Sequence, residues 1–142
     1  MKISEIMSKD VISLSVEDSV EHAAMLMKEH NIGSIPVKTQ EKIVGIVTDR
    51  DIITRCVAEG SDMKIQKVRE IMTSNPVLGD ININVNDATR IMSERQIRRL
   101  PIVSNNELVG MVSLGDFAVE ENLHKEASEA LSEISIPCTH NI

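Results

Sequence analysis

The feature that most constrains the fold of this chain is an internal repeat. When the sequence is aligned with itself at an offset of 65 residues, 14 of the 50 positions from Lys2 to Asp51 are identical and no gap is needed. Such a repeat predicts one structural unit made twice. A copy of this length buries only about 60% of its unfolded surface, which is marginal for independent folding. We therefore expect the two copies to pack face to face.

Each copy carries the same alternation of strand and helix patterns. Apolar residues at the i, i+3, i+4 and i+7 positions predict an amphipathic helix, with Asp18 or Ser19 as the N-cap in copy one and Asn84 or Asn86 in copy two. The order is strand, helix, strand, strand, helix. The expected elements are 11–14, 20–27, 35–38, 43–47 and a helix from about residue 48, then 77–78, 85–92, 100–103, 108–112 and a helix from about residue 113.

The expected fold class is α/β (α+β), built as two pseudo-symmetric β-α-β-β-α motifs. The expected boundaries are 1–62 for the first motif, 63–125 for the second, and 126–142 for a helical extension with a frayed end from Pro137. An apolar stripe at helical spacing predicts that the last helix of copy two continues into this extension. The stripe consists of Val119, Leu123, Ala127, Ala130 and Ile134.

Composition excludes several functions. Phe117 is the only aromatic residue, so the chain lacks the rings on which single-stranded nucleic acid and quaternary ammonium ligands stack. Its 15 Lys and Arg against 22 Asp and Glu give a net charge of −7, which repels phosphate backbones. No apolar run is long enough to cross a bilayer, and Glu5 and Asp10 interrupt any signal peptide. We expect a cytoplasmic protein with neither a nucleic-acid nor a membrane partner.

The sharpest local motif lies where a strand precedes a helix in both copies. A glycine is followed by a hydroxyl residue three positions on and an aspartate six positions on: Gly45, Thr48 and Asp51, then Gly110, Ser113 and Asp116. Free amides at a helix N-terminus bind anions, so the hydroxyl is suited to a phosphate and the carboxylate to a ribose diol. The same spacing fits a capping box with Asp in place of Glu. From spacing alone both interpretations remain open, although one aspartate does not readily fill both roles.

A second feature is a basic segment in an acidic chain. Four arginines lie within ten residues, opposed only by Glu94: Arg90, Arg95, Arg98 and Arg99. The planar guanidinium suits bidentate contact with a phosphate, whereas pairing with Glu94 and Glu107 is the structural alternative. The residues of copy one that align with the last two arginines are Gly33 and Ser34, so the copies are unequally equipped for an anion.

The other candidate residues favour structural roles. His22 and His30 have no partner at ligand spacing, and Cys56 and Cys138 show neither a metal spacing nor a disulfide framework. Cys56 follows an arginine, which allows a mildly lowered thiol pKa, but a small buried residue is the more common outcome. The recurring methionines, Met7 with Met72 and Met27 with Met92, mark core positions. No nucleophile–base pair or phosphate loop is evident, so we expect no enzymatic activity.

Together these motifs resemble the CBS domain, named after cystathionine β-synthase. Copy one carries EIMS, VEHAAMLMKEHNIGSIPV and IVGIVTDRDI, and copy two carries EIMT, VNDATRIMSERQIRRLPIV and LVGMVSLGDFA. The resemblance covers roughly residues 1–125. The chain is thus similar to a tandem CBS pair, or Bateman module, of the stand-alone bacterial or archaeal type. Such a pair also resembles the nucleotide-sensing part of the gamma subunit of AMP-activated protein kinase.

The resemblance implies a sensor that binds AMP, ADP, ATP or S-adenosylmethionine in crevices between its copies, with no required cofactor and no metal. The residues carried over by position are Asp51 and Asp116 for ribose, Thr48 and Ser113 for phosphate, Arg98, Arg99 and Arg50 for phosphates, and Ile12, Ile35, Val77 and Leu100 beside the base. Copy two departs from the Thr-rich first strand that is usual in the family, because it has Pro76-Val77-Leu78-Gly79-Asp80 there.

The resemblance also implies a homodimer and an unidentified effector protein. The leading hypothesis is a regulatory module that signals by conformational change when an adenosine-containing ligand binds. The alternative is a scaffold dimer, independent of ligand, with vestigial pockets. If adenine binds, its base lies between Ile, Val and Leu side chains and backbone groups, because the chain has no ring to stack on it.

Overall fold

The structure, a computed structural model, describes residues 1–137 of the chain. Contacts divide these residues into two units, each described by itself. One consists of Ile12–Pro76 with Asn106–Leu108, and we call it the copy-one unit. The other consists of Met1–Val11, Val77–Asn105 and the chain from Val109 onward, and we call it the copy-two unit.

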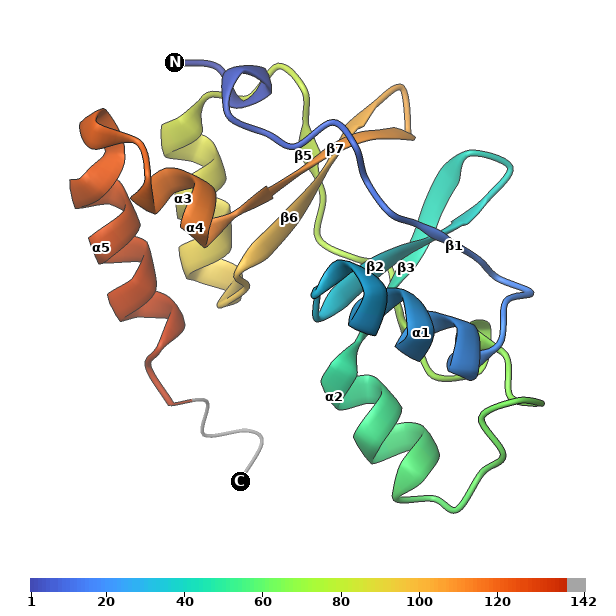
Figure 1. The fold of residues 1–142 in the computed structure, drawn as a ribbon. Coiled ribbons are helices and arrows are strands. Elements are labelled where there is room, and N and C mark those ends of the chain that lie inside the picture. Colours follow the sequence, from blue (N-terminus) through green and yellow to red (C-terminus); the bar gives the residue numbers. More distant parts are fainter. Residues whose placement is uncertain (138–142) are drawn as a thin grey trace. The chain divides into compact units, whose positions relative to one another are not determined.

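The copy-one unit is a small sheet with helices packed on it (Figure 1). Its strand order is β1-β2-β3, and β4 pairs with the other edge of β3. The β1–β2 pair is parallel, with Leu14 opposite Val37, whereas β2 and β4 both run antiparallel to β3. The elements are β1 Leu14–Ser15, α1 Val20–His30, β2 Ser34–Thr39, β3 Lys42–Thr48, α2 Asp49–Ile52, the π-helix η2 Ile53–Val57, the 3-10 helix η3 Val68–Glu70 and β4 Thr73–Ser74.

The copy-two unit repeats this arrangement and adds a helix. Its strand β6 lies between β5 and β7, and β5 runs parallel to β6 with Gly79 opposite Ile102. The elements are the 3-10 helix η1 Ile3–Glu5, β5 Gly79–Asp80, α3 Val85–Arg95, β6 Arg99–Ser104, β7 Glu107–Ser113, α4 Leu114–Ala118, the 3-10 helix η4 Glu121–Leu123 and α5 His124–Ile134. The predicted order of elements is therefore confirmed in both copies.

The two main amphipathic helices begin at equivalent N-caps. The Ser19 hydroxyl accepts a hydrogen bond from the His22 amide at 3.1 Å, and the Asn84 side chain accepts one from the Asp87 amide at 2.9 Å. These side chains decide between the alternatives that the sequence left open. Each helix has 11 residues. Within residues 1–137, no helix combines the length and the apolar character that crossing a bilayer requires.

The first strand of each copy is shorter than the sequence pattern suggests. Strand pairing begins only at Leu14 in copy one and at Gly79 in copy two, not at residues 11 and 77. The apolar residues before these points pack on the cores without joining the ladder; Ile12 and Val77 are partly buried in this way. Hydrophobic character therefore predicts where the first strand segment of each copy lies, but not which of its residues pair with the neighbouring strand.

A shared methionine–glycine contact explains two of the identities in the sequence repeat. In the copy-one unit, a Cβ placed on Gly45 would lie 2.5 Å from the Met72 sulfur, so any larger residue there forces the methionine to shift. In the copy-two unit, a Cβ on Gly110 would lie 2.5 Å from the Met7 sulfur. The methionine near the start of each copy in the sequence thus packs in the unit of the other copy. Both are partly buried against the cores, as the core interpretation of the methionines predicts.

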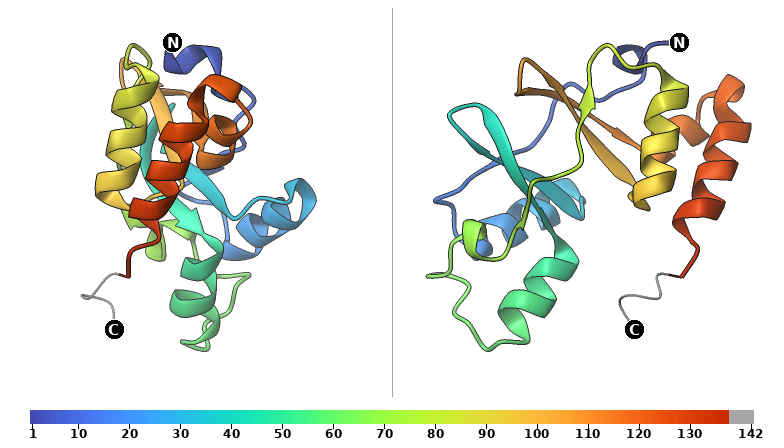
Figure 2. Two further views of the ribbon diagram at one scale, coloured as in Figure 1. Left: turned by 90° about the vertical axis from the view of Figure 1, so that its left-hand side faces the viewer. Right: turned by 180° about the vertical axis from the view of Figure 1, so that it is seen from behind.

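The C-terminal extension is helical, but it does not continue the last helix of copy two. α4 ends at Ala118, and Val119 is 79% exposed, so its place in the predicted apolar stripe is wrong. The chain turns through η4 before α5 begins, so the buried positions of α5 are not in the same helical phase as those of α4. Leu123, Ala127 and Ala130 are buried as predicted. α5 packs along α3 and α4 (Figure 2). The predicted frayed end falls mostly on residues 138–142, outside the described residues.

Candidate functional site

The strand-to-helix junction of copy two brings the predicted phosphate-binding residues together. Ser113 ends β7 and caps α4: its hydroxyl accepts from the Asp116 amide at 3.2 Å, and the Asp116 carboxylate accepts from the Ser113 amide at 2.8 Å. The Leu114 amide donates to the Arg98 carbonyl at 2.9 Å, which holds the residue before β6 against the start of α4. A hydroxyl and two arginines therefore converge through backbone contacts.

These residues line a pocket of about 660 Å³ within the copy-two unit. Its lining contains two arginines and a histidine but no carboxylate, and the remaining residues are small, hydroxylic or apolar. The lining residues are Arg98, Arg99, Ser113, Leu114, Gly115, Ala118, His124, Ala127, Ser128 and Leu131. A cationic wall beside apolar surface is complementary to an anion that carries an apolar group.

The arginines of this pocket are not neutralised by nearby carboxylates. Within residues 1–137, Arg98 and Arg99 form no ion pair, and the predicted alternative partners, Glu94 and Glu107, do not bind them. The one ion pair of the basic segment joins Arg90 to an aspartate one turn earlier on α3, at 3.3 Å. The observed geometry therefore leaves two exposed guanidinium groups at the pocket.

The equivalent junction in copy one has the same backbone contacts and different charges. The Asp49 amide donates to the Gly33 carbonyl at 2.9 Å, which is the counterpart of the contact between Leu114 and Arg98. A carboxylate thus occupies the position of a leucine, and a glycine that of an arginine. Arg50 is exposed on α2 and is the one cation in this short helix.

The capping-box interpretation is confirmed in both copies. In copy one, the Asp51 amide donates to the Thr48 hydroxyl at 3.1 Å and the Thr48 amide donates to Asp51 Oδ2 at 2.9 Å. Asp51 is only 8% exposed, and its other oxygen lies 3.9 Å from Nε of the more exposed Arg55. Asp116 is less buried than Asp51. Contact of either aspartate with a ribose remains a prediction.

The residues predicted to lie beside the base are mostly core residues. Ile35 and Leu100 have no exposed surface, and each lies in the core of its own unit. Phe117, the single ring, is also fully buried. An adenine base at these strands would therefore meet backbone groups and partly buried side chains, and it would stack on no aromatic ring.

One wall of the basic pocket was missed by the sequence reasoning. α5 contributes His124, Ala127, Ser128 and Leu131, which follow the i, i+3, i+4, i+7 spacing of one helix face. The signal was present in the sequence. However, the apolar stripe that packs on the core shares Ala127 with this face and otherwise uses neighbouring positions, so the two faces are not separated by hydrophobicity alone.

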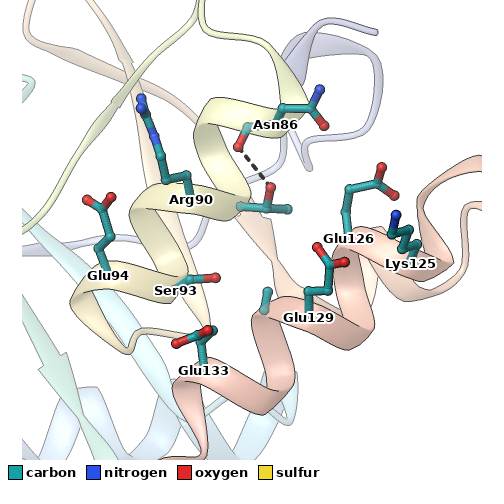
Figure 3. Close-up of a pocket in the computed structure, with 10 residues that line it drawn as sticks. Asn86, Arg90, Ser93, Glu94, Lys125, Glu126, Glu129 and Glu133 are labelled. Carbon is teal, nitrogen blue, oxygen red and sulfur yellow. Dashed lines mark hydrogen bonds between the residues drawn. The ribbon is translucent and has the colours of Figure 1, made fainter.

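The opposite stripe of α5 lines a second, acidic pocket of about 550 Å³ against α3 (Figure 3). Glu126, Glu129 and Glu133 extend from α5, and Glu94 and Arg90 from α3. This pocket also has one lysine, so carboxylates outnumber cations in its lining. It is unsuited to an anion, so α5 presents a basic pocket on one side and an acidic pocket on the other.

In the part of the chain that the structure describes, neither cysteine chemistry nor a metal cluster adds a second candidate site. Cys56 is fully buried, as expected, and desolvation together with the charge of Asp62 raises the pKa of its thiol. The expectation of a small buried residue is therefore confirmed, and the alternative of a lowered pKa is wrong. Cys138 lies outside the described residues. Within residues 1–137, no group of three or more His, Cys, Asp or Glu side chains is arranged to hold a metal ion.

Comparisons with known proteins agree with the fold and with the repeat. The CBS domain family matches residues 3–58 and 68–120. The CBS domain-containing protein YhcV of Bacillus subtilis (strain 168) is 43% identical over 133 residues, which is 94% of each chain. The crystal structure of Hypoxic Response Protein I with two coordinated zinc ions is 30% identical, with a TM-score of 0.78 over 84% of this chain and 98% of that one. The CBS domain pair of protein MJ0100, in complex with 5′-methylthioadenosine and S-adenosyl-L-methionine, is 28% identical, with a TM-score of 0.74 over 83% of this chain and 97% of that one.

Proposed function

Because the chain belongs to the CBS domain family and contains two CBS domains in tandem, we propose that it is a regulatory module that senses adenosine-containing ligands of the AMP, ADP and ATP class. Ligand binding changes the packing of the module, and an effector protein reads the change. The proposed role is therefore binding and not catalysis.

The observation that carries this proposal is the pocket of the copy-two unit. Arg98 and Arg99 suit bidentate contact with phosphate oxygens, and Ser113 stands at the N-terminus of α4 beside them. The apolar part of the lining suits a base and a sugar, and a volume of about 660 Å³ lies in the range of ligand pockets. The adenosine ligands of the MJ0100 domain pair support the same ligand class.

A ligand panel tests the proposal. We expect AMP, ADP, ATP or S-adenosylmethionine at 100 times its dissociation constant to add about 2.7 kcal/mol to the free energy of unfolding. For a chain of this size, the melting temperature then rises by several degrees. The readout must be calorimetric or based on a dye, because the chain has no Trp or Tyr. No response to any of the four ligands would contradict the proposal.

A double variant tests the residues. Replacing Arg98 and Arg99 with alanine removes the charge-assisted hydrogen bonds, each of which contributes about 1.5–3 kcal/mol, so the affinity should fall at least 100-fold. The matched control replaces Arg90 and Arg95 with alanine, which removes the same charge from the same segment outside this pocket. Equal losses of affinity in the two double variants would show that the arginines act only by general electrostatic attraction and not by contacts in this pocket.

The alternative function is a scaffold whose pockets are vestigial, in which no ligand of the panel raises the melting temperature. The capping boxes bear on a separate question, the role of the two aspartates. If they only cap their helices, Asp51→Ala and Asp116→Ala each cost about 1 kcal/mol of stability and leave ligand binding unchanged. If the aspartates hold ribose, the same variants abolish the thermal shift. Homodimerisation and an effector protein belong to the main proposal; light scattering and a pull-down, each with and without AMP, measure them.

A further inference from the structure

The helix that lies outside the family match forms part of the candidate pocket. α5 begins at His124, whereas the second CBS match ends at residue 120. Nevertheless, α5 supplies four of the ten residues that line the basic pocket, all on one helix face. Copy one has no counterpart of this wall, because its last helix runs directly into the π-helix Ile53–Val57.

α5 is fixed on both sides, so this wall is preorganised. Ala127 and Ala130 are at most 5% exposed where the helix packs on the core of the copy-two unit. At its C-terminal end, Gln96 Nε2 donates to the carbonyls of Glu133 at 3.1 Å and Ile136 at 2.9 Å. Gln96 is the C-cap of α3 and precedes the two arginines of the pocket by two and three residues. The helix and the basic segment are thus tied to each other directly.

The chemistry of the two pocket walls is different. The wall at β6 carries the guanidinium groups, whereas the wall at α5 carries small and apolar side chains between His124 and Leu131. Leu131 is 46% exposed, although it lines a pocket next to a packed core. An exposed leucine in a concave surface is suited to cover an apolar group of a ligand whose anionic end is held elsewhere.

We propose that α5 holds the adenine end of the nucleotide in the copy-two pocket, while Arg98 and Arg99 hold its phosphate end. This inference rests on the function proposed above. Leu131 packs on the base, and Ser128, one helical turn closer to the N-terminus, contacts the same end of the ligand. Selectivity for the base is therefore set by a helix outside the repeat, and this pocket discriminates between ligands in a way that copy one does not.

A comparison of AMP with ribose 5-phosphate, which lacks the base, tests the inference. Isothermal titration calorimetry is applied to two variants on α5 and to their matched controls, which lie on α5 or directly after it. Leu131→Ala is paired with Ile136→Ala, because both side chains are exposed and only Leu131 lines the pocket. Ser128→Leu, which fills the pocket, is paired with Ser132→Leu, an exposed position outside it.

We expect Leu131→Ala to weaken AMP binding about fivefold through lost apolar contact, and Ser128→Leu to weaken it about tenfold or more by filling the pocket. Ribose 5-phosphate binding stays near the wild-type level in Leu131→Ala, and both control variants bind AMP normally. If wild-type protein binds AMP and the two pocket variants bind it equally well, the inference fails and the proposed function stands. Parallel losses for AMP and ribose 5-phosphate in Leu131→Ala overturn the inference too. Wild-type protein that binds none of AMP, ADP and ATP contradicts both proposals.

Discussion

The two copies place the same backbone hydrogen bonds at their strand-to-helix junctions and surround them with opposite charges. In copy one the amide of Asp49 meets the carbonyl of Gly33, and in copy two the amide of Leu114 meets the carbonyl of Arg98, both at 2.9 Å. The fold needs these backbone contacts and the capping boxes, and it does not need particular side chains beside them. One junction is therefore free to become a cationic pocket while the other keeps a carboxylate.

A second difference follows immediately along the chain. Copy one continues from α2 into a π-helix and buries Cys56, whereas the aligned residue of copy two, Glu121, begins the 3-10 helix that leads to α5. The extra helix then gives copy two a second pocket wall. The asymmetry of the pair thus arises from a few side chains and one added element, on a common backbone plan.

The largest predicted effect is a difference between two glycine substitutions. Gly45→Ala places its Cβ 2.5 Å from the Met72 sulfur and 3.0 Å from the Thr73 carbonyl oxygen. The three atoms nearest to the Cβ of Gly110→Ala all belong to the Met7 side chain, which is flexible. Because overpacking against backbone is hard to relieve, we expect Gly45→Ala to cost about 2–3 kcal/mol and Gly110→Ala about 1 kcal/mol, measured by urea denaturation.

Double variants check the cause of this difference. Met7→Ala removes the three atoms nearest to the new methyl group at position 110, so most of the cost of adding Gly110→Ala should vanish in that background. Met72→Ala leaves the Thr73 oxygen in place, so part of the cost of Gly45→Ala should persist. Equal rescue at both sites would show that the methionines alone determine the packing.

These glycines show which features sequence reasoning can reach. The repeat aligns Met7 with Met72 and Gly45 with Gly110, so the sequence shows that these positions matter. It does not show that each methionine contacts a glycine of the other copy. The regular elements and helix caps followed from local patterns, because each depends on residues within one turn. The α5 pocket wall did not, because α5 packs on α3 through contacts between residues far apart in sequence.

The next effect concerns the capping hydroxyls. Thr48→Ala and Ser113→Ala each remove an acceptor for a helix N-terminal amide, so each should cost about 1 kcal/mol of stability by thermal denaturation. Only Ser113 lines the cationic pocket, so we expect AMP affinity to fall in Ser113→Ala and to stay unchanged in Thr48→Ala. A loss of affinity in both variants would mean that copy one binds AMP as well, and the asymmetry would then be weaker than the charges suggest.

The β-hairpin turns predict a smaller, stabilising effect. Both residues of each two-residue turn have positive φ: 53° and 67° at Asn105 and Asn106, and 51° and 68° at Gln40 and Glu41. Asparagine and glycine tolerate this conformation better than glutamine and glutamate. Replacing Gln40 by Asn and Glu41 by Gly should therefore stabilise the protein by about 0.5–1 kcal/mol, as measured by urea denaturation. The exposed ion pair between Glu41 and Lys38, 3.3 Å apart, contributes little. Asn105→Gln serves as the reverse test in copy two and should be destabilising.

The smallest effect is a pH dependence confined to copy one, since Cys56 aligns with a glutamate in copy two. Burial and Asp62 raise the pKa of the Cys56 thiol above its ordinary value of 9.0, so the unfolded chain releases this proton first as the pH rises. The wild-type protein therefore loses stability relative to Cys56→Ala as the pH rises above the unfolded pKa, while the difference is flat well below that pH. Urea denaturation from pH 7 to 9.5 measures it, with Cys138→Ser in both proteins so that Cys56 is the only thiol compared. Lysine titration acts on both proteins alike and cancels. A difference that stays flat to pH 9.5 would mean that the folded protein ionises this thiol as easily as the unfolded chain, and that copy one is more open at its π-helix than its packing indicates.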